Sequence, residues 1–191
     1  MAQLAGGILA GGKSSRMGRP KERILLPDGK SMLERVADIL LPLVQKLVVV
    51  GASGGFDPSV LGATRLDDLR PGLGPLAGLE TLLASGGAEG YLVVACDQVR
   101  LTTGLLERLL PAGGSPAALR TEKGVELLPF PVYLPAGFLP IVRAALDQGE
   151  RSSRLLLAGS RIEWRVVAAE AEELVRSINT PEDLRDFIRR D

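Results

Sequence analysis

The stretch that decides the fold is ILAGGKSSRMGRPK, residues 8–21, close to the start of the chain. Its apolar run stops at the paired glycines Gly11 and Gly12, and residues 13–21 then carry four cations and no carboxylate. A buried strand that opens into a glycine-rich, basic loop is suited to holding phosphate. Glycine lets backbone N–H groups approach the anion, and the cations neutralise it. We therefore expect a phosphate-binding loop after the first strand.

Composition narrows the function classes. The chain has 191 residues, 23 Lys and Arg against 23 Asp and Glu, and a pI of about 6.4. This balance argues against a protein that coats nucleic acid or an anionic membrane. A single cysteine and the absence of histidine exclude a disulfide within the chain, Ser-His-Asp catalysis and His-ligated metals. Any metal here is expected on oxygen ligands, with Mg²⁺ as the default.

No apolar run approaches the roughly 20 residues that span a bilayer, and the start of the sequence does not read as a signal peptide. We therefore expect a cytoplasmic enzyme that binds neither membrane nor nucleic acid.

The first part of the chain alternates buried strands with amphipathic helices. The predicted strands are 3–10, 46–51, 63–66 and 91–97, and the predicted helices are 32–42, 76–85 and 103–110. Beyond residue 110, strands near 116–120, 127–134 and 161–168 alternate with helices near 136–148 and 153–159, and a final helix begins at Thr180-Pro181-Glu182-Asp183.

This alternation predicts an α/β fold, a three-layer α/β/α sandwich around a mostly parallel, Rossmann-like sheet. We expect one domain, 1–191, with a nucleotide-binding half at 1–110 and an acceptor-side half at 111–191.

Asp97 ends the most apolar strand of the chain, YLVVACD. In open parallel sheets, ligands bind at the carboxyl ends of the strands. An acid at this position therefore predicts a functional carboxylate, whereas the neighbouring Cys96 is interpreted as a small buried side chain.

The chain also matches the Walker A pattern, from Gly7 to Gly12-Lys13-Ser14. In a true P-loop the strand precedes the first glycine and the four intervening residues form the loop. Here those residues begin Ile8-Leu9-Ala10, which is typical of a strand, so a P-loop kinase or NTPase is a secondary hypothesis.

Four motifs occur in order along the chain: Leu9-Ala10-Gly11-Gly12-x-Ser14-x-Arg16-Met17-Gly18 with Lys21; Gly74-Pro75-Leu76-Ala77-Gly78-Leu79; Ala95-Cys96-Asp97; and Ile178-Asn179-Thr180-Pro181-Glu182-Asp183-Leu184. Together they resemble the nucleotidyltransferases with a Rossmann-like fold. Within that superfamily they are most similar to the molybdenum cofactor guanylyltransferases.

The resemblance implies a Mg²⁺-dependent enzyme that transfers GMP from GTP to the terminal phosphate of molybdopterin and releases pyrophosphate. It implies handover of the product to molybdoenzymes or their chaperones. It also implies GTP contacts at Leu9, Ala10, Gly11, Gly12 and Lys21, a Mg²⁺ ligand at Asp97, a nucleotide contact at Asp68 or its neighbour Asp67, and a molybdopterin-side position at Asn179.

Charge considerations support such a reaction. A phosphate acceptor is already ionised near neutral pH, so the transfer needs charge neutralisation and in-line positioning more than a general base. We expect Arg16 and Lys21 to hold the phosphates, and we interpret Lys13 and Arg19 as surface charges.

The chain departs from the family pattern at several positions, among them Gly51, Gln98, Leu128 and Ser177. Two further alternatives therefore stay open beside the P-loop hypothesis: a cytidylyl- or other nucleotidyltransferase of the same superfamily, and a non-catalytic relative that binds a nucleotide.

Overall fold

The computed structural model describes residues 3–10, 20–51, 57–110 and 114–190. Their strands form a seven-stranded sheet in the order β3-β2-β1-β4-β6-β5-β7. The strands are β1 (Leu4–Leu9), β2 (Lys46–Val50), β3 (Thr64–Leu66), β4 (Gly90–Ala95), β5 (Ala117–Thr121), β6 (Val132–Pro135) and β7 (Glu163–Val167).

The first four strands run parallel, with β1 between β2 and β4. β6 is antiparallel to both of its neighbours, and β7 pairs parallel with β5. β1, β2 and β4 are buried on both faces, which is why their sequences read as continuous apolar runs, whereas the short edge strand β3 is largely exposed.

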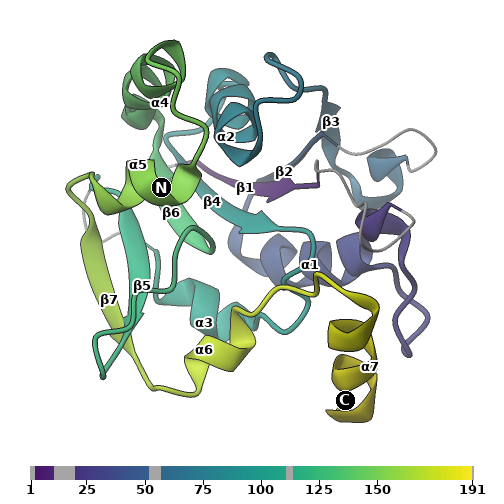
Figure 1. The fold of residues 1–191 in the computed structure, drawn as a ribbon. Helices are drawn as coiled ribbons and strands as arrows, with labels where there is room; N and C mark the ends of the chain where they lie inside the picture. The colour runs from purple at the N-terminus through teal and green to yellow at the C-terminus, as the bar shows by residue number, and fades with distance from the viewer. Residues whose placement is uncertain (1–2, 11–19, 52–56, 111–113, 191) are drawn as a thin grey trace.

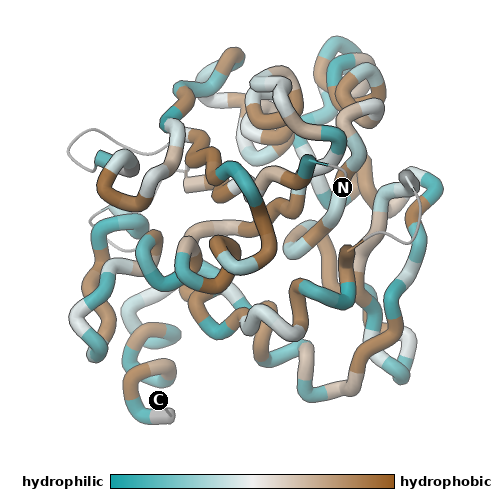
Figure 2. The backbone as a smooth tube through the Cα atoms, turned by 180° about the vertical axis from the view of Figure 1, so that it is seen from behind, coloured by the Kyte–Doolittle hydropathy of each residue, from teal (hydrophilic) through white to brown (hydrophobic). Residues whose placement is uncertain are grey.

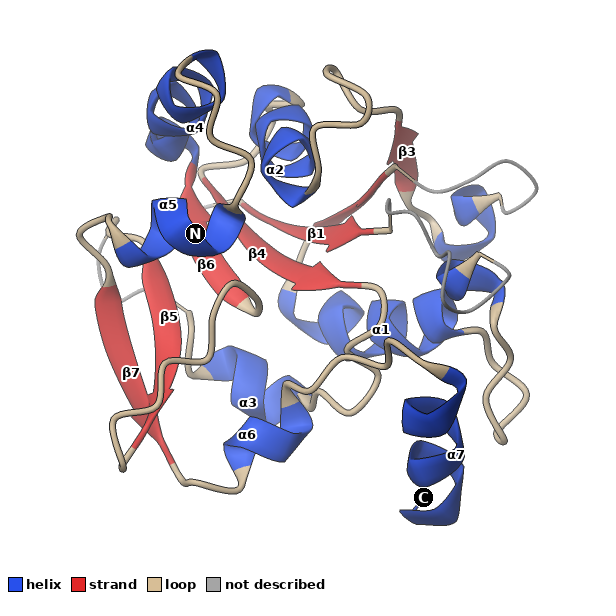
Figure 3. Ribbon diagram, in the orientation of Figure 1, coloured by secondary structure: helices blue, strands red, loops and turns tan. Residues whose placement is uncertain are grey.

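Helices cover both faces of the sheet (Figure 1). One face carries α1 (Met32–Leu40), α3 (Thr103–Glu107) and α6 (Ala171–Leu174), and the other carries α2 (Pro75–Ala84), α4 (Leu139–Asp147) and α5 (Ser153–Ala158); α7 (Pro181–Arg190) lies beside α1 at the end of the chain. Figure 3 shows the resulting layers of helix, strand and helix. The predicted three-layer α/β class is confirmed.

Each face has its own hydrophobic core. Alternate residues of β1 point to opposite sides, so that Ile8 packs in the core under α1 and α3 while Leu9 packs in the core under α2 and α4. In Figure 2 hydrophobic segments run through the middle of the molecule, and α7 shows hydrophobic and hydrophilic bands in turn. Among the described residues, no helix is long and apolar enough to cross a membrane.

A local sequence signal correctly marked the start of α1. The predicted capping box opens α1: the Glu34 backbone N–H donates to Ser31 Oγ at 3.2 Å, and the Ser31 N–H donates to Glu34 Oε2 at 2.6 Å.

The predicted strand at 127–134 is wrong in its first half, because β6 begins only at Val132. Pro129 and Pro131 both follow cis peptide bonds and carry no N–H for a sheet ladder, so the segment before β6 forms an irregular turn. The short helix α6 was not predicted, and neither was the position of β6 between β4 and β5.

Candidate active site

A cavity of about 690 Å³ opens at the carboxyl ends of the parallel strands. It lies where ligands bind in sheets of this type. Its lining comes from the ends of β1, β2 and β4, from the loop before α2, and from two later segments: Leu9, Ala10, Lys21, Val50, Asp68, Gly72, Gly74, Pro75, Gly78, Ala95, Cys96, Asp97, Pro129, Phe130 and Ser177.

Three polar side chains form a cluster at the cavity, two of which belong to its lining. Lys21 Nζ donates to Asp97 Oδ2 and to Asn179 Oδ1, each at 2.7 Å. The side chains of Lys21 and Asp97 are 16% and 13% exposed, so this ion pair is largely shielded from water. The cluster joins the segment after the basic loop, the end of β4 and the chain before α7.

Backbone contacts hold Asp97 and Asn179 together. The Ile178 N–H donates to the Asp97 carbonyl at 2.9 Å, which brings the residue before Asn179 against the end of β4. Asp183 Oδ2 accepts from the Asn179 N–H at 2.9 Å and from the Thr180 N–H at 2.8 Å, capping α7. The terminal motif therefore caps a helix and contributes a polar group to the site.

Asp68 lines the cavity on the other side, after β3. Burial, together with the charge of Asp67, raises the pKa of this carboxyl above its ordinary value of 3.8. Asp67 itself is 85% exposed and pairs with Arg65 at 3.2 Å. Of the two acids that the sequence offered, Asp68 is the one that reaches the cavity.

Sequence analysis missed the contacts that hold the loop of Asp68 in place. Thr81 Oγ1 of α2 accepts from the Leu69 N–H at 2.9 Å, and the buried Glu80 pairs with Arg70 Nε at 2.9 Å. Gly74 ends this loop with φ +78°, a backbone conformation that favours glycine, and Pro75 then begins α2.

Asp97 has the features expected of a Mg²⁺ ligand. Its second oxygen, Oδ1, is buried and has no hydrogen-bond partner among the described residues. An unpaired, buried carboxylate oxygen is costly, and it is a chemically suitable ligand for a cation. No group of three or more acidic or other ligating side chains surrounds it among the described residues. This suits Mg²⁺, which keeps several waters and uses one or two carboxylates together with substrate phosphates.

The structure brings Leu9, Ala10, Lys21, Asp68 and Asp97 to one cavity, and it connects Asn179 to that cavity through Lys21. Gly11, Gly12 and Arg16 lie outside the described residues, as do Lys13 and Arg19. Cys96 lines the cavity with a buried thiol whose pKa is raised by burial and by the charge of Asp97, consistent with its interpretation as a small buried side chain.

Gly7 lies inside β1, paired with Val48 on one side and Val93 on the other. A Cβ atom at this position would lie 2.1 Å from Leu82 Cδ2. Packing of α2 against the strand accounts for this glycine, so the Walker A match does not describe a P-loop.

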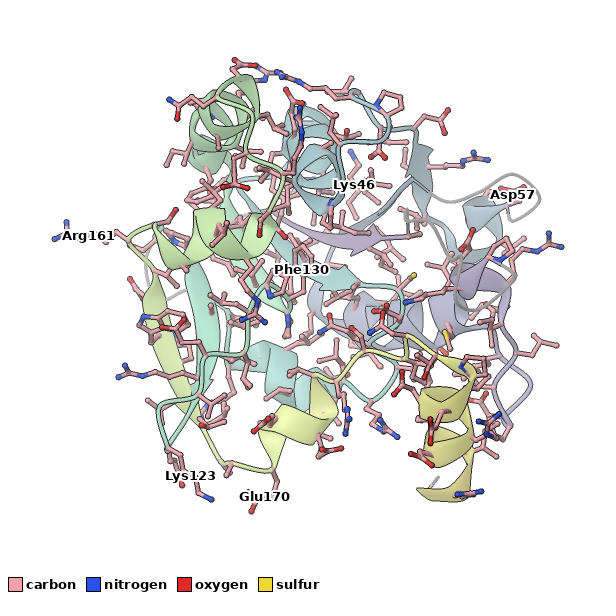
Figure 4. All side chains as sticks on the ribbon, viewed as in Figure 1. Lys46, Asp57, Lys123, Phe130, Arg161 and Glu170 are labelled. Atoms are coloured by element: carbon pink, nitrogen blue, oxygen red, sulfur yellow. The ribbon has the colours of Figure 1, made fainter. Side chains whose placement is uncertain are left out.

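Cavity residues from the later part of the chain were also missed. Phe130, labelled in Figure 4, lies in the middle of that view, whereas Asp57, Lys123, Arg161 and Glu170 project from its edge. No motif or periodicity marks Phe130 as a cavity residue, because the irregular segment that carries it is positioned by tertiary contacts. Ser177 stands out in the sequence only as a departure from the family pattern.

The mostly parallel sheet and the shielded acid after β4 agree with the predicted class, the nucleotidyltransferases with a Rossmann-like fold. Residues 6–163 match the family model described as MobA-like NTP transferase domain, and the chain belongs to this family.

Relatives match over almost the whole length. The probable molybdenum cofactor guanylyltransferase of Opitutus terrae is 34% identical, covering 98% of this chain and 95% of its own. The molybdenum cofactor guanylyltransferase of Rhizobium meliloti is 35% identical, covering 93% of this chain and 87% of its own.

Solved structures support the fold. Molybdopterin-guanine dinucleotide biosynthesis protein A from Archaeoglobus fulgidus superposes with a TM-score of 0.74 at 24% identity, covering 97% of each chain. The 2-C-methyl-D-erythritol 4-phosphate cytidylyltransferase from Thermus thermophilus superposes with a TM-score of 0.71 at 18% identity, covering 96% of each chain.

Proposed function

We propose that this chain is a Mg²⁺-dependent molybdenum cofactor guanylyltransferase, which joins GMP from GTP to the terminal phosphate of molybdopterin and releases pyrophosphate. One observation carries the proposal: Lys21, Asp97 and Asn179 meet at the end of β4 in a member of the MobA-like family whose full-length relatives bear that name.

The cavity lining comes from both proposed halves of the chain, 1–110 and 111–191. We assign to the GTP side the residues at the ends of β1 and β2 with two residues near α2: Leu9, Ala10, Val50, Asp68 and Gly78. We assign Pro129, Phe130 and Ser177 to the side of the phosphorylated pterin. In this proposal the reacting phosphates lie beside Asp97 and Lys21.

Lys21 neutralises negative charge in this scheme. Its ammonium group donates to Asp97 Oδ2 and to Asn179 Oδ1, and these two contacts hold it beside the cavity. An incoming triphosphate competes for the same ammonium group, and Gly11, Gly12 and Arg16 are proposed to supply the remaining phosphate contacts. A fixed cation at this point costs no reorganisation when charge develops on the departing pyrophosphate.

Asp97 would hold Mg²⁺ through its unpartnered oxygen Oδ1. Bound there, the ion would neutralise charge on the phosphates and make the α-phosphorus easier to attack. No general base is required, because the acceptor phosphate is ionised near neutral pH.

Thermal denaturation with each of the four NTPs and Mg²⁺ tests the nucleotide assignment. A ligand at about 100 times its dissociation constant stabilises the folded state by about 2.7 kcal/mol. For a chain of this size that corresponds to about 5–10 °C in Tm. We expect GTP to give a shift of this kind and the other three to give much smaller ones.

Equal or larger stabilisation by CTP would favour the cytidylyltransferase alternative. Stabilisation by GTP without pyrophosphate release in the presence of molybdopterin would favour a non-catalytic relative.

A further inference from the structure

Gln98, directly after Asp97, is a buried polar residue that the proposed reaction does not use. It is 3% exposed, and its amide is engaged at both ends. Nε2 donates to the Phe130 carbonyl at 2.7 Å and to the Val175 carbonyl at 2.8 Å, while Oε1 accepts from the Ala95 N–H at 3.0 Å. Both amide hydrogens are therefore used, each on a different segment of the chain.

The two carbonyls belong to segments that lie outside the strands and helices. Phe130 lies in the turn with two cis prolines before β6, and Val175 follows α6 in the stretch that leads to α7. These partners are 32 and 77 residues away from Gln98 in the sequence. A single side chain thus ties two irregular segments to the end of β4.

Both segments supply the side of the cavity that we assign to the acceptor. Phe130 and Ser177 line the cavity, and Asn179 accepts the hydrogen bond from Lys21. The GTP side is held differently, because Thr81 and Glu80 of α2 fix the loop of Asp68 without any contact to Gln98.

We propose that Gln98 is a positioning residue that sets the acceptor side of the cavity relative to Asp97. It does not touch the reacting atoms; it acts by holding Phe130 and the segment from Val175 to Asn179 in place. The acceptor assignment rests on the proposed function, whereas the positioning itself rests on the hydrogen bonds of Gln98. Loss of these hydrogen bonds should therefore weaken binding of the acceptor more than binding of GTP.

The main test is Gln98→Met, which keeps the length of the side chain and removes its donors. Hydrogen–deuterium exchange of the ligand-free protein should accelerate about 10-fold or more at residues 127–132 and 174–180, with little change at 66–78. In steady-state kinetics, KM for molybdopterin should rise about fivefold or more, while KM for GTP changes less than twofold.

Gln98→Glu and Thr103→Val complete the design. The glutamate variant places a carboxylate against the two carbonyls. Its hydrogen exchange and its KM for molybdopterin should therefore increase at least as much as in the methionine variant. Thr103→Val removes one hydrogen bond, to the Ile39 carbonyl at 3.1 Å, from a residue outside the cavity lining. It should lower Tm without changing either KM. If Gln98→Met does not fold, Gln98→Asn takes its place, because it keeps the amide on a shorter side chain. The same changes in hydrogen exchange and in KM for molybdopterin are then expected, with smaller magnitude.

Unchanged or uniformly accelerated exchange in the Gln98 variants would overturn the proposal, and so would equal increases in KM for GTP and for molybdopterin. Failure of the proposed function has a different signature: the wild-type protein would then release no pyrophosphate from GTP with molybdopterin. In that case the exchange experiment, which uses no ligand, still decides whether Gln98 positions these segments.

Discussion

At the scale of single residues, the site is built around an ion pair that leaves one oxygen unsatisfied. Lys21 donates to Asp97 Oδ2, whereas Oδ1 is buried and has no partner in the described part of the chain. A desolvated carboxylate oxygen without a partner is unfavourable, which is why we assign the proposed Mg²⁺ to Oδ1. The metal and Lys21 would then use different oxygens of the same carboxylate.

Asp68 gives a pH-dependent prediction at the same scale. An acid whose pKa is higher in the folded than in the unfolded state costs stability above both values, and the cost disappears as the pH falls through the folded pKa to below 3.8. Asp68→Asn should therefore raise Tm of the ligand-free protein at about pH 7, and the gain should shrink as the pH is lowered towards about 4. Because Asp68 lines the proposed GTP side, the same variant should reduce stabilisation by GTP.

Thermal denaturation across that pH range checks the Asp68 prediction, and Asp67→Asn is the matched control. Asp67 is 85% exposed, and its charge is the smaller of the two causes that raise the pKa of Asp68, so Asp67→Asn should give a smaller change in Tm of the same sign. An Asp68→Asn protein less stable than wild type at neutral pH would contradict the account.

At the scale of elements, the site depends on how closely α2 packs against β1. α2 is apolar on nearly all sides, and Leu76, Leu79 and Leu82 are fully buried. Gly7 allows this approach, and the same helix holds the loop of Asp68 through Thr81 and Glu80. Packing of one strand and one helix thus sets two parts of the cavity.

Gly7→Ala should test this packing. The new Cβ would lie 2.1 Å from Leu82 Cδ2, and Leu82 is fully buried and cannot swing into solvent. Overpacking of this kind costs about 1–3 kcal/mol, which should lower Tm by several degrees in a thermal denaturation experiment.

Gly104→Ala in α3 is the corresponding control, because a Cβ there meets no atom within 4 Å and alanine favours helix. It should leave Tm unchanged or raise it slightly. A Gly7→Ala protein as stable as wild type would mean that α2 does not need this glycine.

Elements with a strong local signal were predictable. Continuous apolar runs marked β1, β2 and β4, and the acid after β4 marked Asp97. The turn before β6 was mistaken for strand because its leucines and Phe130 outweighed two prolines. The contact between Lys21 and Asn179 spans 158 residues, so no local pattern could reveal it. Nor did the sequence distinguish Asp68 from Asp67, since that choice depends on which side chain faces the cavity.

At the scale of the whole molecule, the sheet separates two hydrophobic cores, and the cavity residues lie together at the carboxyl ends of its parallel strands. The parallel strands bring the end of β1 beside the end of β4, while the segment before β6 and the chain before α7 also contribute to the cavity lining. Residues from the beginning, middle and end of the chain therefore meet at Asp97.

The most direct test of the central claim is pyrophosphate release from GTP with Mg²⁺ and molybdopterin, compared between the wild-type protein and Asp97→Asn. We expect wild-type release that requires both substrates, and a loss of about 100-fold or more in the variant with little change in Tm. Asp38→Asn, at an exposed ion pair on α1, serves as the control and should retain activity. Full activity of Asp97→Asn, or orthophosphate in place of pyrophosphate from the wild-type protein, would contradict the account.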